Sequence, residues 1–82
     1  MNKILVEFGI PVLGISFDAF VPAHISAYEM LEMIKRAVNE MMDSGLILDE
    51  STSLCRSDGK ILNVNLSVYE LGVRNGSKLM LI

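Results

Sequence analysis

Apolar and polar residues alternate along two stretches near the start of the chain, residues 3–8 and residues 15–21. A period of two is typical of β-strands, which present successive side chains to opposite faces of a sheet. Residues 9–14 between them contain two glycines and Pro11, so the two strands are predicted to form a hairpin. The faces expected to pack inward carry Ile4, Val6 and Phe8 in the first strand and Ile15, Phe17, Ala19 and Val21 in the second.

A long amphipathic helix is predicted after the hairpin, beginning at Ala27. Ser26 and Glu29 have the spacing of a capping box, in which each side chain bonds the backbone amide of the other residue. Gly45 is placed to end the helix, because glycine favours the left-handed conformation found just after a helix. The apolar stripe predicted to face the sheet consists of Ala27, Met30, Leu31, Ile34, Ala37, Val38, Met41 and Met42.

The rest of the sequence predicts shorter elements. Leu46 to Leu48 predicts an apolar connection under the sheet, residues 52–57 a third strand, and residues 61–62 a short fourth strand after a tight turn. Residues 66–82 predict a turn of helix followed by a last strand. The element order is therefore ββαβ(β)β, an α+β arrangement in which four to five strands pack on one helix. A chain of 82 residues is expected to form one domain, 1–82.

Composition excludes several classes of function. The net charge is -3 and the seven Lys and Arg residues are scattered, which argues against binding to nucleic acid or to a membrane surface. No apolar run is long enough to span a membrane, so a soluble cytoplasmic protein is expected. Cys55 is the only cysteine, which excludes an internal disulfide and a multi-cysteine zinc site.

The reactive side chains do not form a catalytic or metal-binding pattern. His24 would need an oriented nucleophile and a carboxylate to act as a base, and Ser26 is better explained as a helix cap. Cys55 is expected to be a small buried apolar residue and not a nucleophile. The acidic residues at 49–50 and Asp58 lack the spacing of a calcium loop. No catalytic residue, cofactor or metal is therefore expected, and the protein is predicted not to be an enzyme.

Four pieces of the sequence carry a resemblance to a known family: residues 17–23 (FDAFVPA), the helix from Ala27, the turn and strand at 59–62, and residues 66–82. They resemble the ubiquitin-like β-grasp fold, with its mixed sheet, and within it the EsaB/YukD family of bacterial proteins encoded with type VII secretion systems. The resemblance implies a cytoplasmic, non-enzymatic adaptor, an accessory or regulatory component that acts by protein–protein contact. The implied partner is a larger protein of the apparatus, such as the secretion ATPase or a membrane subunit with a cytoplasmic domain.

Two other functions are compatible with the same fold. Ubiquitin-like modifiers and sulfur carriers extend past the last strand to a Gly-Gly carboxylate, whereas this sequence ends at Ile82. Conjugation and sulfur transfer are therefore not expected. A helper subunit of an enzyme complex is the third interpretation, for which the neighbouring genes are the test.

Partner-binding residues are expected on the face of the sheet that the helix leaves open. If Gly59 is aligned with the corresponding turn of ubiquitin, Cys55 faces the core and Arg56 faces outward, whereas a one-residue slip would bury Leu54 instead. An apolar patch on this face would serve docking or self-association as a homodimer, and an edge strand offers a second mode of pairing. Scattered exposure with partial cover by loops is the alternative interpretation. The candidates are Leu5, Phe20, Leu54, Arg56, Met80 and Ile82, with Arg56 and Lys78 as a charged rim.

Overall fold

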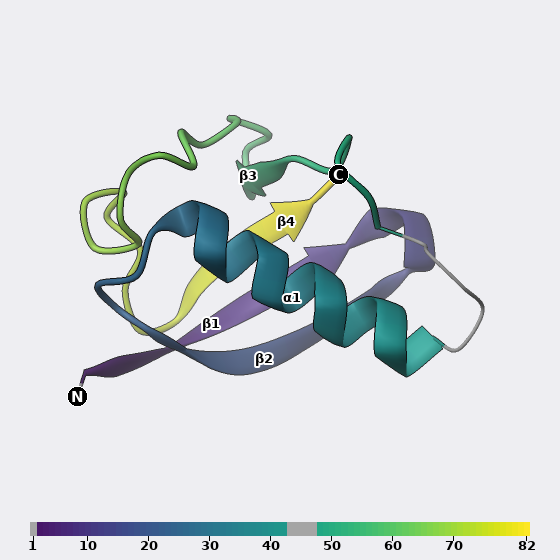
Figure 1. Ribbon diagram of the computed structural model, residues 1–82, viewed down its shortest axis with the longest axis horizontal. Coiled ribbons are helices and arrows are strands. Elements are labelled where there is room, and N and C mark those ends of the chain that lie inside the picture. The colour runs from purple at the N-terminus through teal and green to yellow at the C-terminus, as the bar shows by residue number, and fades with distance from the viewer. Residues whose placement is uncertain (1, 43–47) are drawn as a thin grey trace.

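The computed structural model describes residues 2–42 and 48–82, and its elements follow the predicted order (Figure 1). These elements are β1 (Lys3–Ile10), the 3-10 helix η1 (Pro11–Leu13), β2 (Ile15–Pro22), α1 (Ala27–Met42), β3 (Leu54–Arg56) and β4 (Ser77–Leu81). Helix α1 lies across one face of a four-stranded sheet in the order β2-β1-β4-β3, in which β1 and β4 are parallel and the other pairs antiparallel. The predicted β-grasp architecture, a mixed sheet on one helix, is therefore confirmed. The predicted helix end at Gly45 and the connection through Leu46 and Ile47 lie outside the described residues.

β1 and β2 form the predicted hairpin, in continuous antiparallel register over residues 3–10 and 15–22. Gly14 closes it with a φ of 65°, in the left-handed region that favours glycine, and its amide donates to the Pro11 carbonyl at 3.0 Å. The side chains alternate between the two faces as predicted. Those of Val6, Phe8, Ile10 and Val21 are buried, whereas those of Ser16, Asp18 and Phe20 are exposed.

Helix α1 begins where two separate parts of the chain supply hydrogen-bond acceptors. The hydroxyl of Ser26 accepts from the Glu29 amide at 3.1 Å, which is one half of the predicted capping box. The amides of the first two helical residues donate to the carbonyl oxygens of Leu66 and Val64, at 2.8 and 2.9 Å. Because the first amides of a helix have no partner within it, these bonds fix where the helix starts.

The predicted apolar stripe of α1 is confirmed except at Ala37 and Met41. Met41 is 60% exposed although it shares the angular sector of the buried helix residues, and Ala37 at the edge of the stripe is also exposed. Met42, at the other edge of the stripe, is partly buried and packs against the core. Helical periodicity predicts the direction of a side chain but not how closely the rest of the chain covers it. The buried helix residues are Ala27, Met30, Leu31, Ile34 and Val38.

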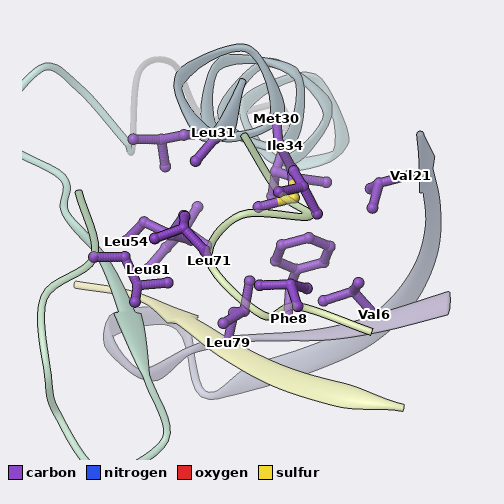
Figure 2. Packing of buried hydrophobic residues seen from close by; sticks show 14 of the residues in the cluster. Val6, Phe8, Val21, Met30, Leu31, Ile34, Leu54, Leu71, Leu79 and Leu81 are labelled. Atoms are coloured by element: carbon purple, nitrogen blue, oxygen red, sulfur yellow. The ribbon is translucent and has the colours of Figure 1, made fainter. Parts of the chain in front are cut away.

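The core fills the space between α1 and the sheet (Figure 2). The ring of Phe8 is fully buried there, with its centroid 6.0 Å from that of the half-buried Phe17 and the two rings tilted by 34°. Among the described residues, no polar or charged residue is buried. Apolar burial is therefore the main stabilising contribution to this fold. Labelled in Figure 2 are Val6, Phe8, Val21, Met30, Leu31, Ile34, Leu54, Leu71, Leu79 and Leu81.

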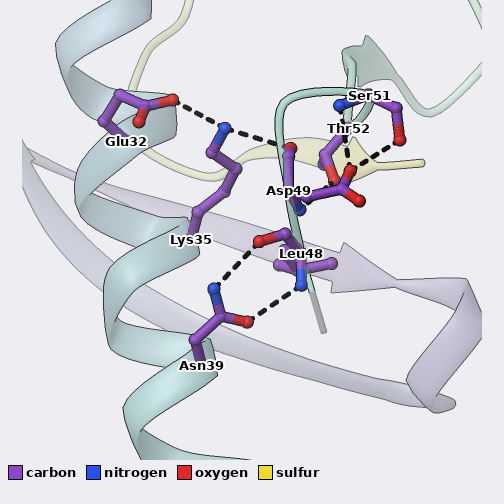
Figure 3. A network of polar contacts seen from close by, with 7 residues as sticks. All are labelled: Glu32, Lys35, Asn39, Leu48, Asp49, Ser51 and Thr52. Carbon is purple, nitrogen blue, oxygen red and sulfur yellow. Dashed lines mark hydrogen bonds and ion pairs between the residues drawn. The ribbon is translucent and has the colours of Figure 1, made fainter. Parts of the chain in front are cut away.

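The segment that begins at Leu48 is hydrogen-bonded to α1 (Figure 3). The Asn39 amide group donates to the Leu48 carbonyl at 2.9 Å, and its oxygen accepts from the Leu48 amide at 2.9 Å. One turn earlier on the helix, the Lys35 ammonium lies 2.7 Å from the Glu32 carboxylate and 3.1 Å from the Asp49 carbonyl. These contacts hold the buried Leu48 side chain against the core.

Replacing Asn39 with aspartate is expected to destabilise the protein by about 1–3 kcal/mol, because a carboxylate cannot donate to the Leu48 carbonyl and leaves it unpaired. Urea unfolding followed by circular dichroism measures this loss. Asn65→Asp is the matched control, since Asn65 is exposed and the same chemical change there should cost within about 0.5 kcal/mol. Equal stability of the two variants would contradict the role assigned to Asn39.

The third strand is shorter than predicted, because only Leu54–Arg56 has strand geometry. The predicted strand at 61–62 is reduced to an isolated bridge between Cys55 and Ile61, which leaves four strands in the sheet. A tight turn joins the two segments. Its Gly59 has a φ of 91° and donates from its amide to the Arg56 carbonyl at 2.9 Å.

A second capping box, at Ser67 and Glu70, was not predicted. The Ser67 amide donates to the Glu70 carboxylate at 2.9 Å, and the Glu70 amide donates to the Ser67 hydroxyl at 3.0 Å. Hydrogen bonding to Ser67 holds the pKa of the Glu70 carboxyl below its usual value. The bonds order the turn that leads to Leu71 and Val73, both of which are buried.

Candidate protein-binding face

The open face of the sheet carries two groups of apolar residues. At one end, Phe20 of β2 stands opposite Leu5 of β1, and the Phe20 side chain is 67% exposed. At the other end, Met80 of β4 is half-buried and is followed by Ile82, which is 54% exposed. These four predicted residues therefore share the side of the sheet opposite α1, as alternation predicted.

A row of charged residues separates the two apolar groups. In the register of the sheet, Glu7 of β1 stands between Asp18 of β2 and Lys78 of β4. The predicted rim residue Lys78 therefore lies within the face and not at its edge. Pairing Glu7 with Lys78 is favourable, whereas Asp18 beside Glu7 places two like charges opposite each other. The open face is thus polar in the middle and apolar at both ends, which agrees with the interpretation of scattered apolar exposure and not with that of one contiguous patch.

Leu54 and Arg56 do not belong to the open face, and both predictions were wrong. Leu54 is 1% exposed and stands opposite Leu81 in the core. A guanidinium nitrogen of Arg56 donates to the carbonyl of Leu71. The register of β3 is shifted by one residue from the alignment based on Gly59, which exchanges the two faces of the strand.

The same shift moves Cys55 to the side of the sheet away from the helix, opposite Met80. Its side chain is nevertheless fully buried, and this burial raises the pKa of the thiol. A thiol in such surroundings is a poor nucleophile at neutral pH. The prediction of a buried Cys55 is confirmed, while its placement on the core face is wrong.

The remaining candidates for chemistry are used by local structure or lie alone on the surface. Hydrogen bonds from Ser51 hold the pKa of the Asp49 carboxyl below its usual value, and Asp58 accepts from the Lys60 amide at 3.0 Å. His24 is exposed. The described residues contain no cluster of three or more His, Cys, Asp or Glu side chains that could hold a metal ion. Within residues 2–42 and 48–82, no helix combines the length and apolar character that a bilayer crossing requires.

Two of the clefts formed by residues 2–42 and 48–82 lie beside the sheet. One, of about 420 Å³, runs between α1 and β3 and has Tyr28 and Ile61 among its lining residues. The other, of about 380 Å³, lies where β1 begins and includes Tyr69 and Arg74, which the sequence had not singled out. Their segment has no regular secondary structure, so no periodic pattern could have placed these two residues together. The second cleft is called the Arg74 cleft, and its lining consists of Asn2, Lys3, Ile4, Ala23, Tyr69, Val73 and Arg74.

A mixed sheet in the order β2-β1-β4-β3, covered on one face by a single helix, defines the chain as a ubiquitin-like domain. The family model described as "WXG100 protein secretion system (Wss), protein YukD" matches residues 5–81, and the chain belongs to this family. The membership implied by the sequence pieces is therefore confirmed, and the chain is a ubiquitin-like domain of a type VII secretion component family. No protein of curated function matches the sequence.

Solved structures of secretion proteins share this fold. The EccD5 ubiquitin-like domain from Mycobacterium xenopi is similar with a TM-score of 0.82 at 23% identity, covering 100% of this chain and 94% of that chain. The ubiquitin-like domain of ECCD1 from Mycobacterium tuberculosis gives a TM-score of 0.76 at 18% identity, covering 100% and 99%. A chain of the MycP5-free ESX-5 inner membrane complex gives a TM-score of 0.71 at 18% identity, covering 100% of this chain and 21% of that chain. At these identities the similarity establishes the fold alone.

Proposed function

We propose that this protein is a non-enzymatic adaptor of a type VII secretion system, which acts in the cytoplasm as a single domain by binding another protein of the apparatus. The family membership and the two exposed apolar ends of the open sheet face together carry the proposal. Its partner would be the secretion ATPase or a membrane subunit with a cytoplasmic domain. A similar domain forms part of a chain in the ESX-5 inner membrane complex, which supports a partner of this kind.

The open face is suited to protein recognition. Phe20 supplies an exposed aromatic side chain, a residue type enriched where interfaces bury their strongest contacts. The charged row of Asp18, Glu7 and Lys78 can then set the orientation of the partner, because charge complementarity contributes mainly specificity and association rate. Apolar ends would contribute affinity and the charged middle would select the partner.

Replacing Phe20 with aspartate should greatly weaken partner capture and leave the fold intact, because this side chain is largely exposed. A tagged pull-down from the source bacterium, with bound proteins identified on native and denaturing gels, measures the change. Val12→Asp is the matched control, since Val12 is 76% exposed on η1 and the substitution adds the same charge. Capture by the control and the wild type, with loss in Phe20→Asp, is the expected result.

Two outcomes would overturn the proposal. Undiminished capture by Phe20→Asp would remove the open face from the interaction. A ladder of covalent adducts that survives denaturation would place the chain among the modifiers, since an adaptor forms no covalent bond with its partner.

A further inference from the structure

The Arg74 cleft contains a guanidinium held in one orientation. The carbon at the centre of the Arg74 guanidinium lies 3.9 Å from the centroid of the Tyr69 ring, a cation–π contact. One terminal nitrogen, Nη1, also donates to the carbonyls of Tyr69 and Val73, both at 2.9 Å. These three contacts restrict the orientation of the exposed Arg74 guanidinium.

These contacts use only part of the hydrogen-bonding capacity of Arg74. A guanidinium has five N–H groups, and the two backbone carbonyls account for those on Nη1. Within the described part of the chain, the N–H groups of Nε and Nη2 have no acceptor. This pair of donors is the edge that matches the two oxygens of a carboxylate.

The first residues of β1 add backbone groups to the same cleft. Pairing of β1 with β4 begins only at Val6. Leu5 lies just before Val6, and its backbone groups point toward the β4 side of β1. The Leu5 amide donates to the side-chain oxygen of Asn75 at 2.7 Å, and the Leu5 carbonyl accepts from the Gly76 amide at 2.8 Å. Backbone groups in an antiparallel hairpin alternate in direction, so those of Lys3 point the same way as those of Leu5. They reach the edge of the sheet at the Arg74 cleft, where an extended segment could bond to them.

The charge of the Arg74 cleft is positive on an acidic protein. Among the described residues that line it, only Lys3 and Arg74 are charged, while the chain as a whole carries a net charge of -3. Glu70 follows Tyr69 in the sequence, and its carboxylate accepts a hydrogen bond from the Ser67 amide. An extended polyanion would be repelled by the rest of the surface, whereas one or two carboxylates on a protein segment fit the two cations.

We propose that the Arg74 cleft binds a carboxylate side chain in an extended acidic segment of a protein partner. Nε and Nη2 of Arg74 would donate to the two carboxylate oxygens, Lys3 would add a second positive charge, and the backbone of β1 would align the segment. The inference rests on the proposed function in that it assumes a protein partner. It assigns to that partner a second point of attachment, separate from the Phe20 end of the open face.

Titration of the ¹⁵N-labelled protein with an acetylated and amidated peptide that carries two glutamates among uncharged residues tests the proposal by NMR. Chemical-shift changes are expected at Lys3, Tyr69 and Arg74 and should shrink as salt is added. The same peptide with glutamine in place of both glutamates should cause none of them. Arg74→Ala should weaken binding at least about tenfold, because a paired charge-assisted bond is lost.

Two further variants separate the paired donors from simple positive charge. Arg74→Lys should also bind weakly, since an ammonium group keeps the charge but lacks the planar pair of donors. Lys60→Ala is the matched control, because it removes one exposed positive charge from the turn after β3 and should bind as the wild type does. The dispersion of the amide signals shows in each case whether the variant is folded.

Several results would overturn the proposal: shifts spread over the whole surface, equal shifts with the glutamine peptide or inorganic phosphate, or wild-type binding by Arg74→Ala. The Phe20→Asp variant should still bind the peptide, since Phe20 does not line the cleft. Peptide binding without partner capture would therefore count against the proposed function alone. Partner capture without peptide binding would count against the cleft alone.

Discussion

A Leu54→Asp variant is expected to be unfolded under conditions in which the wild type is folded. The Leu54 side chain is 1% exposed and lies in the core beside Leu81 (Figure 2). Loss of a buried leucine side chain alone costs about 2–5 kcal/mol, and a carboxylate in its place would have no partner. Since the free energy of unfolding of a small domain is about 5–15 kcal/mol, the Leu54→Asp change removes most or all of the stability of this protein. Far-UV circular dichroism and amide signal dispersion measure the outcome.

The comparison with two other variants makes this expectation specific to the register of β3. Leu54→Ala should remain folded with stability lowered by about 2–5 kcal/mol. Phe20→Asp, which introduces the same charge on the open face, should unfold at nearly the same urea concentration as the wild type. A folded and stable Leu54→Asp protein would mean that β3 is shifted by one residue and that Cys55 faces the helix.

Replacing Phe8 with alanine is expected to cost about 3–5 kcal/mol of unfolding free energy. The Phe8 ring is fully buried in the middle of the sheet, between α1 and the strands, and it contacts the Phe17 ring. The cavity left behind is enclosed by the helix above and by neighbouring strands on both sides, so the surroundings can relax only in part. Urea unfolding at equilibrium measures the loss.

Phe17→Ala is the matched control for this second substitution. It removes the same ring and the same aromatic pair, but Phe17 is half-buried on the edge strand β2. Its cost should therefore be clearly smaller than that of Phe8→Ala. Equal losses for the two variants would mean that the aromatic contact, and not enclosure within the core, determines the cost.

The long elements could be predicted from the sequence because each repeats its period several times. Alternation over residues 3–8 and 15–21 gave both the strands and their faces, and the capping residue Ser26 gave the helix start. β3 has only three residues, Leu54–Arg56, so alternation within it does not determine which side chains face the helix and which face away. The choice depends on pairing with β4, which is a long-range contact and has no local signature.

The outward direction of Phe20 could be predicted from the sequence, whereas the pattern of the open face as a whole could not. Alternation within one strand shows which side a residue faces, but the neighbours across the sheet depend on register. The row of Asp18, Glu7 and Lys78 joins three strands, one of which, β4, is distant in sequence from the other two, so the row could not be predicted from any one strand. The Arg74 cleft was missed for a similar reason, since Lys3 and Arg74 come from opposite ends of the chain.

The place of β4 in the sheet has a consequence for how the protein acquires its structure. β4 is the last strand along the chain, yet it lies between β1 and β3 and provides the partner for both. A nascent chain that has emerged only as far as the helix can close the β1–β2 hairpin but leaves the other edge of β1 bare. The sheet can therefore be completed only after the synthesis of residues 77–81. Until then the exposed edge of β1 is the part of the growing chain most in need of protection from other strands.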